Sequence, residues 1–131
     1  MATIFTRIIA GEIPCYKIAE NDKFFAFLDI SPYQKGHTLV VPKREEDYIF
    51  NLGDDELAQM TVFAKSVAQA VEKAVPCKRI GMMVIGLMVP HAHIHLIPLQ
   101  QESDMFGSNR PEVSPEEMAD LAAAIRAAYE A

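Results

Sequence analysis

The sequence has little of what marks secreted, membrane-spanning or disulfide-rich proteins. Its 131 residues contain only two cysteines, Cys15 and Cys77, which lie far apart and form no C-x-x-C motif. Two such thiols are typical of a reducing compartment, so we expect a cytoplasmic protein. No stretch approaches the ~20 apolar residues of a membrane span. Residues 1–10 lack the apolar core that follows a basic cap in a signal peptide, so we expect none.

Basic residues are scarce as well. The 12 Lys and Arg residues are outnumbered by 18 Asp and Glu residues, which gives a formal net charge of −6. This balance argues against nucleic acid or an anionic membrane as a partner, although local donors can still bind a small anionic ligand. No repeat, low-complexity segment or linker interrupts the chain. Its length suits one hydrophobic core, so we expect residues 1–131 to form a single domain.

Local patterns predict an α+β domain with an antiparallel sheet of about five strands. Runs of β-branched, aromatic and other apolar residues predict strands over residues 16–19, 24–28, 37–41, 79–85 and 89–98. The strand over residues 79–85 is expected to be buried, although its apolar run over residues 82–85 could instead be a sheet edge that a second copy covers. Apolar residues at spacings of three and four predict one long helix over residues 54–75. Because strands and helices do not alternate regularly, we expect the sheet to be antiparallel.

Signals near the two ends of the chain predict two further helices. Thr3 is a suitable N-cap for a short helix over residues 3–10, which Gly11 would end. Towards the C-terminus, Ser114 is followed by proline and two glutamates, a composition typical of a helix start. A polar loop over residues 100–113 precedes this last helix.

Three of the four histidines lie within five residues, at His91, His93 and His95. Alternate side chains of a strand point to opposite faces, so a strand over residues 89–98 would place the three imidazoles in a row. The apolar residues between them would face the core. Imidazole has a reference pKa of about 6.5, which suits nucleophilic, acid–base and metal-binding roles. This segment is therefore the predicted functional site.

Two kinds of chemistry compete for this cluster. A zinc or iron site needs three or four ligands around one ion, and His37 is the remaining histidine that could join it. Histidines at i, i+2 and i+4 spread over about 13 Å of strand, however, too far for one ion with bonds of about 2.1 Å. A neutral imidazole can instead attack an electrophilic phosphorus while its neighbours donate hydrogen bonds to phosphoryl oxygens. We therefore expect a nucleophile, no metal and no cofactor, with a metal site as the alternative.

The histidine cluster belongs to a longer pattern. His91-Ala92-His93-Ile94-His95-Leu96-Ile97 reads His-φ-His-φ-His-φ-φ, where φ is an apolar residue. With residues 4–14, 26–32 and 36–43, this segment resembles the histidine triad (HIT) superfamily of nucleotide-binding hydrolases and transferases. The resemblance implies a HIT-like fold, with residues 99–131 as a more variable C-terminal loop and helix. It also implies a homodimer.

The resemblance implies a role for each matched polar residue. His93 would be the nucleophile that carries the nucleotidyl group as a covalent intermediate, and His95 would contact the phosphate. His91 would hold the orientation of the array, with His37 behind it. Asp29 would bind the ribose hydroxyls, and the alternative for Asp29 is a turn-forming residue before the loop that follows.

The same resemblance implies a binding slot and a reaction. Phe5, Ile8, Phe27 and Ile30 would form an apolar slot around a purine base, with plain core packing as the alternative for each. The implied reaction is hydrolysis at the α-phosphorus of a purine nucleoside phosphoramidate or a related nucleotide derivative. The alternatives are a nucleotide-binding module with little turnover and a dinucleoside polyphosphate hydrolase.

The sequence departs from the family pattern just before the triad. Many members carry an Asn and then a polar pair there, which hydrogen-bond the phosphate, whereas this chain has Ile80, Leu87 and Met88. Loss of a side-chain donor that meets developing charge costs about 3–4 kcal/mol of transition-state stabilisation. The phosphate therefore has fewer predicted donors. Arg110 in the late loop is either an additional phosphate contact or a solvated surface residue.

Overall fold

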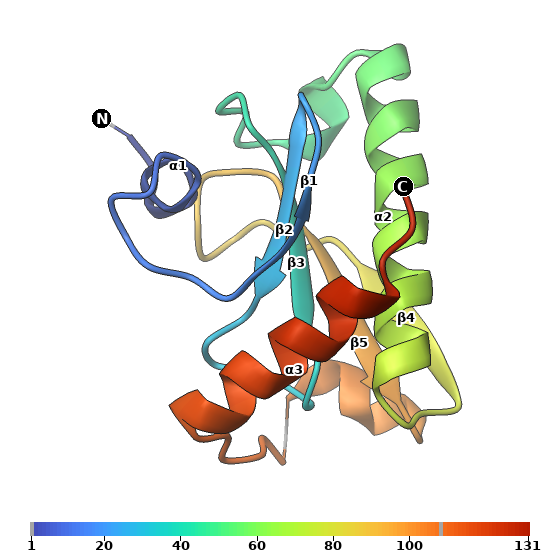
Figure 1. The fold of residues 1–131 in the computed structure, drawn as a ribbon. Helices are drawn as coiled ribbons and strands as arrows, with labels where there is room; N and C mark the ends of the chain where they lie inside the picture. The colour runs from blue at the N-terminus through green and yellow to red at the C-terminus, as the bar shows by residue number, and fades with distance from the viewer. Residues whose placement is uncertain (1, 108) are drawn as a thin grey trace.

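A computed structural model describes residues 2–107 and 109–131 (Figure 1). One antiparallel sheet has the strand order β1-β2-β3-β5-β4. The strands are β1 (Lys17–Glu20), β2 (Phe24–Leu28), β3 (Thr38–Pro42), β4 (Arg79–Met83) and β5 (Ile94–Leu99). The helices are α1 (Ile4–Ile9), α2 (Asp54–Ala74) and α3 (Pro115–Ala128), with short 3-10 helices η1 (Ile49–Asn51) and η2 (Glu102–Phe106). The predicted α+β class is confirmed, including the antiparallel sheet, the long helix and the C-terminal helix.

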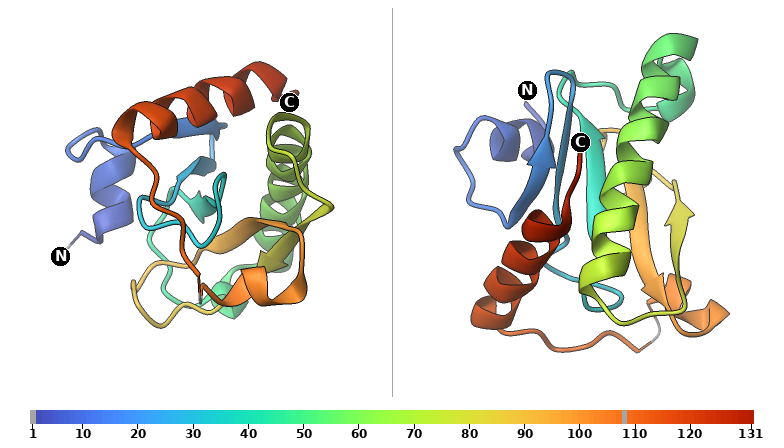
Figure 2. Two further views of the ribbon diagram at one scale, coloured as in Figure 1. Left: turned by 90° about the horizontal axis from the view of Figure 1, so that it is seen from below. Right: turned by 45° about the vertical axis from the view of Figure 1, so that its right-hand side comes forward.

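The sheet lies between two layers of helix, as Figures 1 and 2 show. Helices α2 and α3 cover one face, and α1 lies against the other. Side chains of β2 alternate between these layers, so Phe24 joins the larger core beneath α2, while Phe25 and Phe27 pack with Phe5 of α1. Strands β2 and β3 are accordingly buried over their whole lengths.

The predicted helix starts are confirmed. The Thr3 hydroxyl accepts a hydrogen bond from the Thr6 N–H, and the Ser114 hydroxyl accepts one from the Glu117 N–H, each at 3.1 Å. Each bond satisfies an N–H group that the first turn of a helix leaves unpaired. Helix α2 ends at Ala74, one residue before its predicted end.

The strand predicted over residues 79–85 is an edge strand, so the prediction of a buried strand is wrong and the alternative of a sheet edge is the one observed. Within residues 2–107 and 109–131, strand β4 ends at Met83 and pairs only with β5, which leaves its other long side open. The side chain of Met82 is 57% exposed, and Val84 and Ile85 beyond the strand are also exposed. An apolar run alone does not distinguish a central strand from an edge strand.

The strand predicted over residues 89–98 forms only in its second half, since β5 begins at Ile94. The apolar side chains still enter the core beneath α2 as predicted (Ala92, Ile94 and Leu96). The first half leaves the ladder because β3 ends at Pro42, which has no N–H to donate. The Pro42 carbonyl oxygen accepts a hydrogen bond from the His91 side chain instead.

The loop after β5 returns to the end of the molecule that carries the histidines. The predicted loop over residues 100–113 contains η2 and then brings Arg110 against the ring of Tyr33.

Cys15 and Cys77 are free thiols. Across residues 2–107 and 109–131, no helix combines the length and apolar character needed to cross a membrane.

Candidate active site

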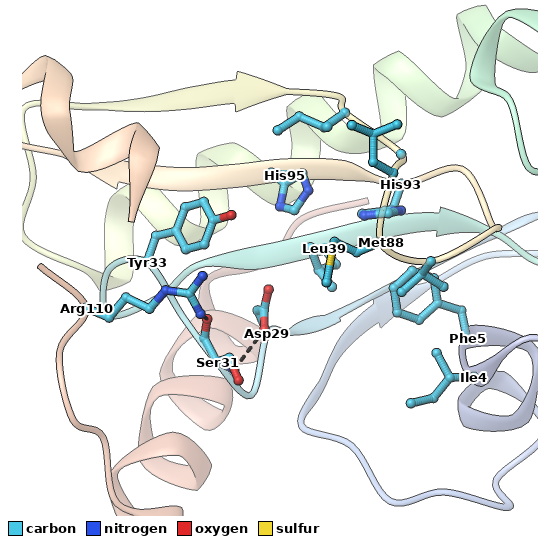
Figure 3. A pocket seen from close by; sticks show the side chains of 14 residues that line it. Ile4, Phe5, Asp29, Ser31, Tyr33, Leu39, Met88, His93, His95 and Arg110 are labelled. Atoms are coloured by element: carbon cyan, nitrogen blue, oxygen red, sulfur yellow. Dashed lines mark hydrogen bonds between the residues drawn. The ribbon is translucent and has the colours of Figure 1, made fainter. Parts of the chain in front are cut away.

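The histidines line a cavity of about 260 Å³ on the face of the sheet that carries α1 (Figure 3). Its wall is formed by the start of α1, the loop after β2, the segment before the triad, the triad itself and the loop after η2. The lining residues are Ile4, Phe5, Asp29, Ser31, Tyr33, Leu39, Ile85, Gly86, Leu87, Met88, Val89, His93, His95 and Arg110. Figure 3 shows Asp29, Ser31, Tyr33 and Arg110 at one side of the cavity and α1 at the other.

His93 is held in one orientation and one tautomer. Its Nδ1 lies 2.7 Å from the backbone carbonyl oxygen of His91. A carbonyl oxygen only accepts, so Nδ1 of neutral His93 carries the proton and Nε2 keeps its lone pair. The ring also packs edge-on against Phe5, with centroids 5.1 Å apart. A neutral imidazole with a free Nε2 in a cavity wall has the state that nucleophilic attack requires.

His91 is buried and binds both α1 and β3. Its Nε2 lies 2.7 Å from the carbonyl oxygen of Pro42, so Nε2 carries the proton. Its Nδ1 must then accept, and the Thr3 hydroxyl donates to it at 2.7 Å. Burial lowers the pKa of His91, which favours the neutral ring. His91 therefore fixes the backbone that orients His93.

A chain of hydrogen bonds sets the tautomer of His95. The backbone N–H of Tyr33 donates to Nδ1 of His37 at 3.0 Å, so the proton of His37 lies on Nε2. This Nε2 is 3.0 Å from Nδ1 of His95, which must accept. His95 therefore carries its own proton on Nε2. Since His95 lines the cavity, it brings a neutral N–H donor to the site.

Burial keeps this pair of rings neutral. Desolvation lowers the pKa of His37 to about 4, although the negative charge of Asp29 opposes the shift. Burial also lowers the pKa of His95 to about 4, and repulsion from His93 adds to the effect. Near neutral pH, His37 and His95 therefore offer hydrogen bonds rather than positive charge.

The predicted place of His37 is wrong in one respect. It does not lie behind His91 but contacts His95, with ring centroids 5.2 Å apart. The register explains this, because Leu39 of β3 is paired with His95, and His37 comes two residues earlier on the same face of the chain. Thr3 takes the place beside His91 instead.

Asp29 combines a turn with a place in the cavity wall. Its Oδ1 accepts the backbone N–H of Ser31 at 2.8 Å, as expected of a turn-forming residue. Its Oδ2 lies 3.7 Å from Nε2 of His37. The turn therefore fixes the carboxylate at the cavity, while its role towards a ribose stays a prediction.

The four residues predicted for the base slot occupy different places. Phe5 lines the cavity, and Phe27 is buried beside it with ring centroids 5.5 Å apart. Ile8 packs against the same cluster. Ile30 is 75% exposed and is not among the lining residues. Phe27 thus has a packing role in the structure, and the slot around a base stays a prediction.

Several lining residues were not identified from the sequence. Ser31 and Tyr33 follow β2 in a loop that has no periodic pattern. The Tyr33 ring lies against His37 and stacks on His95, with centroids 6.2 Å apart for the stacked pair. Leu39 could have been found from the sequence, because it lies two residues after His37 in a predicted strand and therefore on the same face.

The segment before the triad forms an apolar part of the wall. Leu87 and Met88 line the cavity and are 87% and 93% exposed, so neither side chain is packed within the protein. Because these two residues line the cavity, the side-chain donors that the sequence lacks at their positions are also missing from this part of the cavity wall. Ile80 differs, because it lies in β4 opposite Pro98 and packs against the main core.

One group of side chains has the spacing of metal ligands. Within the described part of the chain, Asp29, His37 and His95 each offer a ligand atom, and these atoms lie within 4.8 Å of one another. The hydrogen bonds oppose coordination, because the Tyr33 N–H uses the Nδ1 lone pair of His37. The Nε2 atom then carries a proton and has no lone pair for a metal. His37 and His95 are therefore better described as a hydrogen-bonded pair beside the Asp29 carboxylate.

Comparison with known proteins agrees with this geometry. The family model described as HIT domain matches residues 10–102. The adenosine 5'-monophosphoramidase hnt1 of Schizosaccharomyces pombe is 37% identical over 125 residues, which cover 92% of this chain and 93% of that protein. A Hit-like protein involved in cell-cycle regulation from Bartonella henselae has a TM-score of 0.83 at 31% identity, covering 96% of this chain and 95% of its own.

A zinc-bound histidine triad family protein from Mycobacterium smegmatis has a TM-score of 0.82 at 26% identity, covering 98% of this chain and 93% of its own. The sheet, its helices and the histidine cluster define the class of histidine triad domains. The chain belongs to the HIT family, as its motif predicted.

Proposed function

We propose that the protein is a nucleotide hydrolase that cleaves a purine nucleoside phosphoramidate at its α-phosphorus, through a covalent nucleotidyl group on His93. The observation that carries the proposal is the hydrogen bond between Nδ1 of His93 and the His91 carbonyl, which leaves the Nε2 lone pair free. The 37% identity to an adenosine 5'-monophosphoramidase supports the same type of reaction.

The reaction proceeds in two displacements. In the first, Nε2 of His93 forms a bond to phosphorus while the bond from phosphorus to the leaving amine breaks, and the amine takes a proton from water. His95 donates a hydrogen bond from Nε2 to a phosphoryl oxygen, which stabilises the developing charge. In the second, water attacks phosphorus and the bond to His93 breaks. The products are the amine and the nucleoside monophosphate, with neutral His93 restored and the proton of the attacking water released.

The two sides of the cavity suit the two ends of a nucleoside. The Asp29 carboxylate can accept hydrogen bonds from both ribose hydroxyls. Ile4, Phe5 and Leu39 provide an apolar surface for the base. A small number of placed polar groups within an apolar cavity is the usual composition of a ligand site.

Rapid-quench mass spectrometry tests the covalent step. During turnover of an adenosine phosphoramidate, we expect a transient adenylyl adduct on the peptide that contains His93, together with release of AMP. An adduct confined to another residue would overturn the assignment of the nucleophile. Release of AMP without any adduct would favour direct attack by water.

A nucleotide-binding module with little turnover is the second candidate. It is favoured by Leu87 and Met88, which place two apolar side chains where phosphate donors would otherwise accelerate the reaction. Binding of AMP without release of AMP from any phosphoramidate tested would support the module over the enzyme.

We also propose a homodimer formed through the open edge of β4. An unpaired edge leaves backbone groups free to pair, and Met82 and Val84 beside it are exposed. Sedimentation should show a dimer at micromolar concentration and a shift towards monomer in Met82→Asp. A stable wild-type monomer would count against the dimer.

The free thiols of Cys15 and Cys77 fit a reducing compartment, and we propose the cytoplasm.

A further inference from the structure

The permanent positive charge at the cavity comes from one side chain. Among the described residues that line it, Arg110 is the one lysine or arginine, and Asp29 is the one carboxylate. His95 does not add charge near neutral pH, because burial lowers its pKa to about 4. An anionic ligand in this cavity therefore depends on Arg110 for a fixed opposite charge.

Arg110 is held in place by groups that do not neutralise it. Its guanidinium carbon lies 4.7 Å from the centre of the Tyr33 ring, which is a cation–π distance. Its Nη1 donates to the Ser31 carbonyl oxygen at 3.4 Å. Figure 3 shows the guanidinium lying beside Ser31 and Asp29 at the cavity wall. These contacts orient the planar head and leave most of its five N–H donors available.

Among the described residues, Arg110 takes part in no ion pair, which is also true of Arg79 and Arg126, but it alone of these three lines the cavity. Two other arginines do form ion pairs. Arg7 pairs with Glu12, and Arg44 pairs with Glu46 and Glu56, each within 4.0 Å. Within the described part of the chain, no carboxylate oxygen lies within that distance of Arg110. A positioned guanidinium without an acidic partner, at the wall of a cavity, is available for a ligand.

We propose that Arg110 is a phosphate-binding residue of this site and contacts a phosphoryl oxygen of the bound nucleotide. The inference rests on the proposed function and names the residue that recognises the charge of the substrate. Leu87 and Met88, which also line the cavity, offer no side-chain donor. A guanidinium presents parallel N–H groups that match two phosphate oxygens, so one side chain can supply two hydrogen bonds.

Paired binding measurements with AMP and adenosine test the proposal, because the two ligands differ only in the phosphate. We expect Arg110→Gln to weaken AMP binding about tenfold, the loss of one strong charge-assisted contact, while adenosine binding changes less than about twofold. Arg126→Gln is the matched control. Arg126 also donates to a backbone carbonyl, that of Lys17, but it lies in α3 on the other face of the sheet. Neither affinity should change in the control.

Several outcomes would overturn the proposal. Unchanged AMP affinity in Arg110→Gln excludes the contact, and a parallel loss of AMP and adenosine affinity indicates a role in holding the cavity instead. A wild-type protein that binds the two ligands equally overturns the phosphate contact and leaves the nucleoside site standing. A wild-type protein that binds neither ligand overturns the proposed nucleotide function itself. Arg110→Lys, which keeps the charge but loses the paired donors, should bind AMP with intermediate affinity.

Discussion

The cavity has a histidine side and a loop side, and the two are built in opposite ways. On the histidine side, His37, His91 and His93 each bond to a backbone group of the same chain, which fixes their tautomers. On the loop side, Leu87 and Met88 are almost fully exposed. The histidine side chains are therefore fixed before a ligand binds, whereas Leu87 and Met88 become buried only when a ligand or another chain covers them.

This difference separates chemistry from selectivity. Fixed donors require no reorganisation during a reaction, so in the proposed mechanism the histidine side would determine whether phosphorus is attacked. Covering an exposed apolar side chain with a ligand or another chain lowers the free energy of the complex. The loop side would therefore determine which ligand binds. Substitutions on the two sides should then differ in both size and kind of effect.

The largest effect is expected on the histidine side, for His93→Asn. Without the imidazole Nε2 no covalent intermediate forms, so kcat should fall by about 10⁴-fold or more. AMP affinity should stay within about twofold, because the ribose and base contacts do not use this ring. Steady-state kinetics and calorimetric titration measure the two quantities. Near-normal kcat in this variant would remove His93 from the mechanism.

The hydrogen-bonded chain behind His95 should give the next largest effect. In His37→Phe the Nδ1 atom of His95 loses its donor, so His95 is free to adopt the tautomer that places no proton on Nε2. We expect kcat to fall about 100-fold, the scale of one lost donor in the transition state.

Tyr33→Phe is the matched control for this variant. It keeps the backbone N–H that donates to His37, so kcat should change by less than about threefold. Thermal unfolding of both variants shows whether they are folded. Equal losses of kcat in folded His37→Phe and Tyr33→Phe would contradict the tautomer argument.

Acidification should destabilise the histidine side of the fold. The folded-state pKa values of His37 and His95 are about 4, below the unfolded value of about 6.5, so the unfolded chain binds more protons between these pH values. Stability is then fully present above pH ~6.5 and falls as the pH drops towards ~4. Allowing for solvent screening of His95, we expect a loss of about 2 kcal/mol between pH 7 and 5, roughly 30-fold in the folding constant.

Urea unfolding at these two pH values measures the loss. The carboxylates whose pKa values are lowered, such as those of Glu20 and Asp104, titrate below this range and do not contribute to it. His37→Phe should reduce the pH dependence. A stability that is constant from pH 7 to 5 would contradict the burial of neutral histidines.

The smallest effect is expected on the loop side. Met88→Ser places a hydroxyl donor beside the triad, and we expect kcat to rise about tenfold, part of what one well-placed donor supplies. Met88 is 93% exposed, so its replacement should not change the unfolding temperature. Val62→Ser, at a 64% exposed position on α2 outside this cavity, is the control. An unchanged kcat in Met88→Ser would show that backbone donors already serve the phosphate.

The sequence predicts most of the fold because the deciding signals are local. Thr3 and Ser114 are followed by helices, and the strand over residues 24–28 is observed with the predicted bounds. The errors concern partners distant in the sequence. That β4 lies at an edge, and that Pro42 ends the ladder before His93, depend on which strands pair.

In the candidate site, too, local signals are predicted from the sequence and contacts between distant segments are not. The three histidines are recognised from a short motif, because spacing and residue type identify them. Asp29 is assigned only through the resemblance of residues 26–32 to the family. The contact between His37 and His95 and the arrival of Arg110 at Tyr33 are set by strand register and by a loop return. Neither leaves a periodic pattern in the sequence.

The Thr3 hydroxyl joins two parts of the molecule through a single oxygen atom. That oxygen accepts the Thr6 N–H and donates to Nδ1 of His91. The first turn of α1 and the first histidine of the triad therefore share one hydroxyl, so fraying of the helix start also removes the hydrogen bond to Nδ1 of His91. An extension or strain that pulls on the N-terminus would reach the histidines through this atom without entering the cavity.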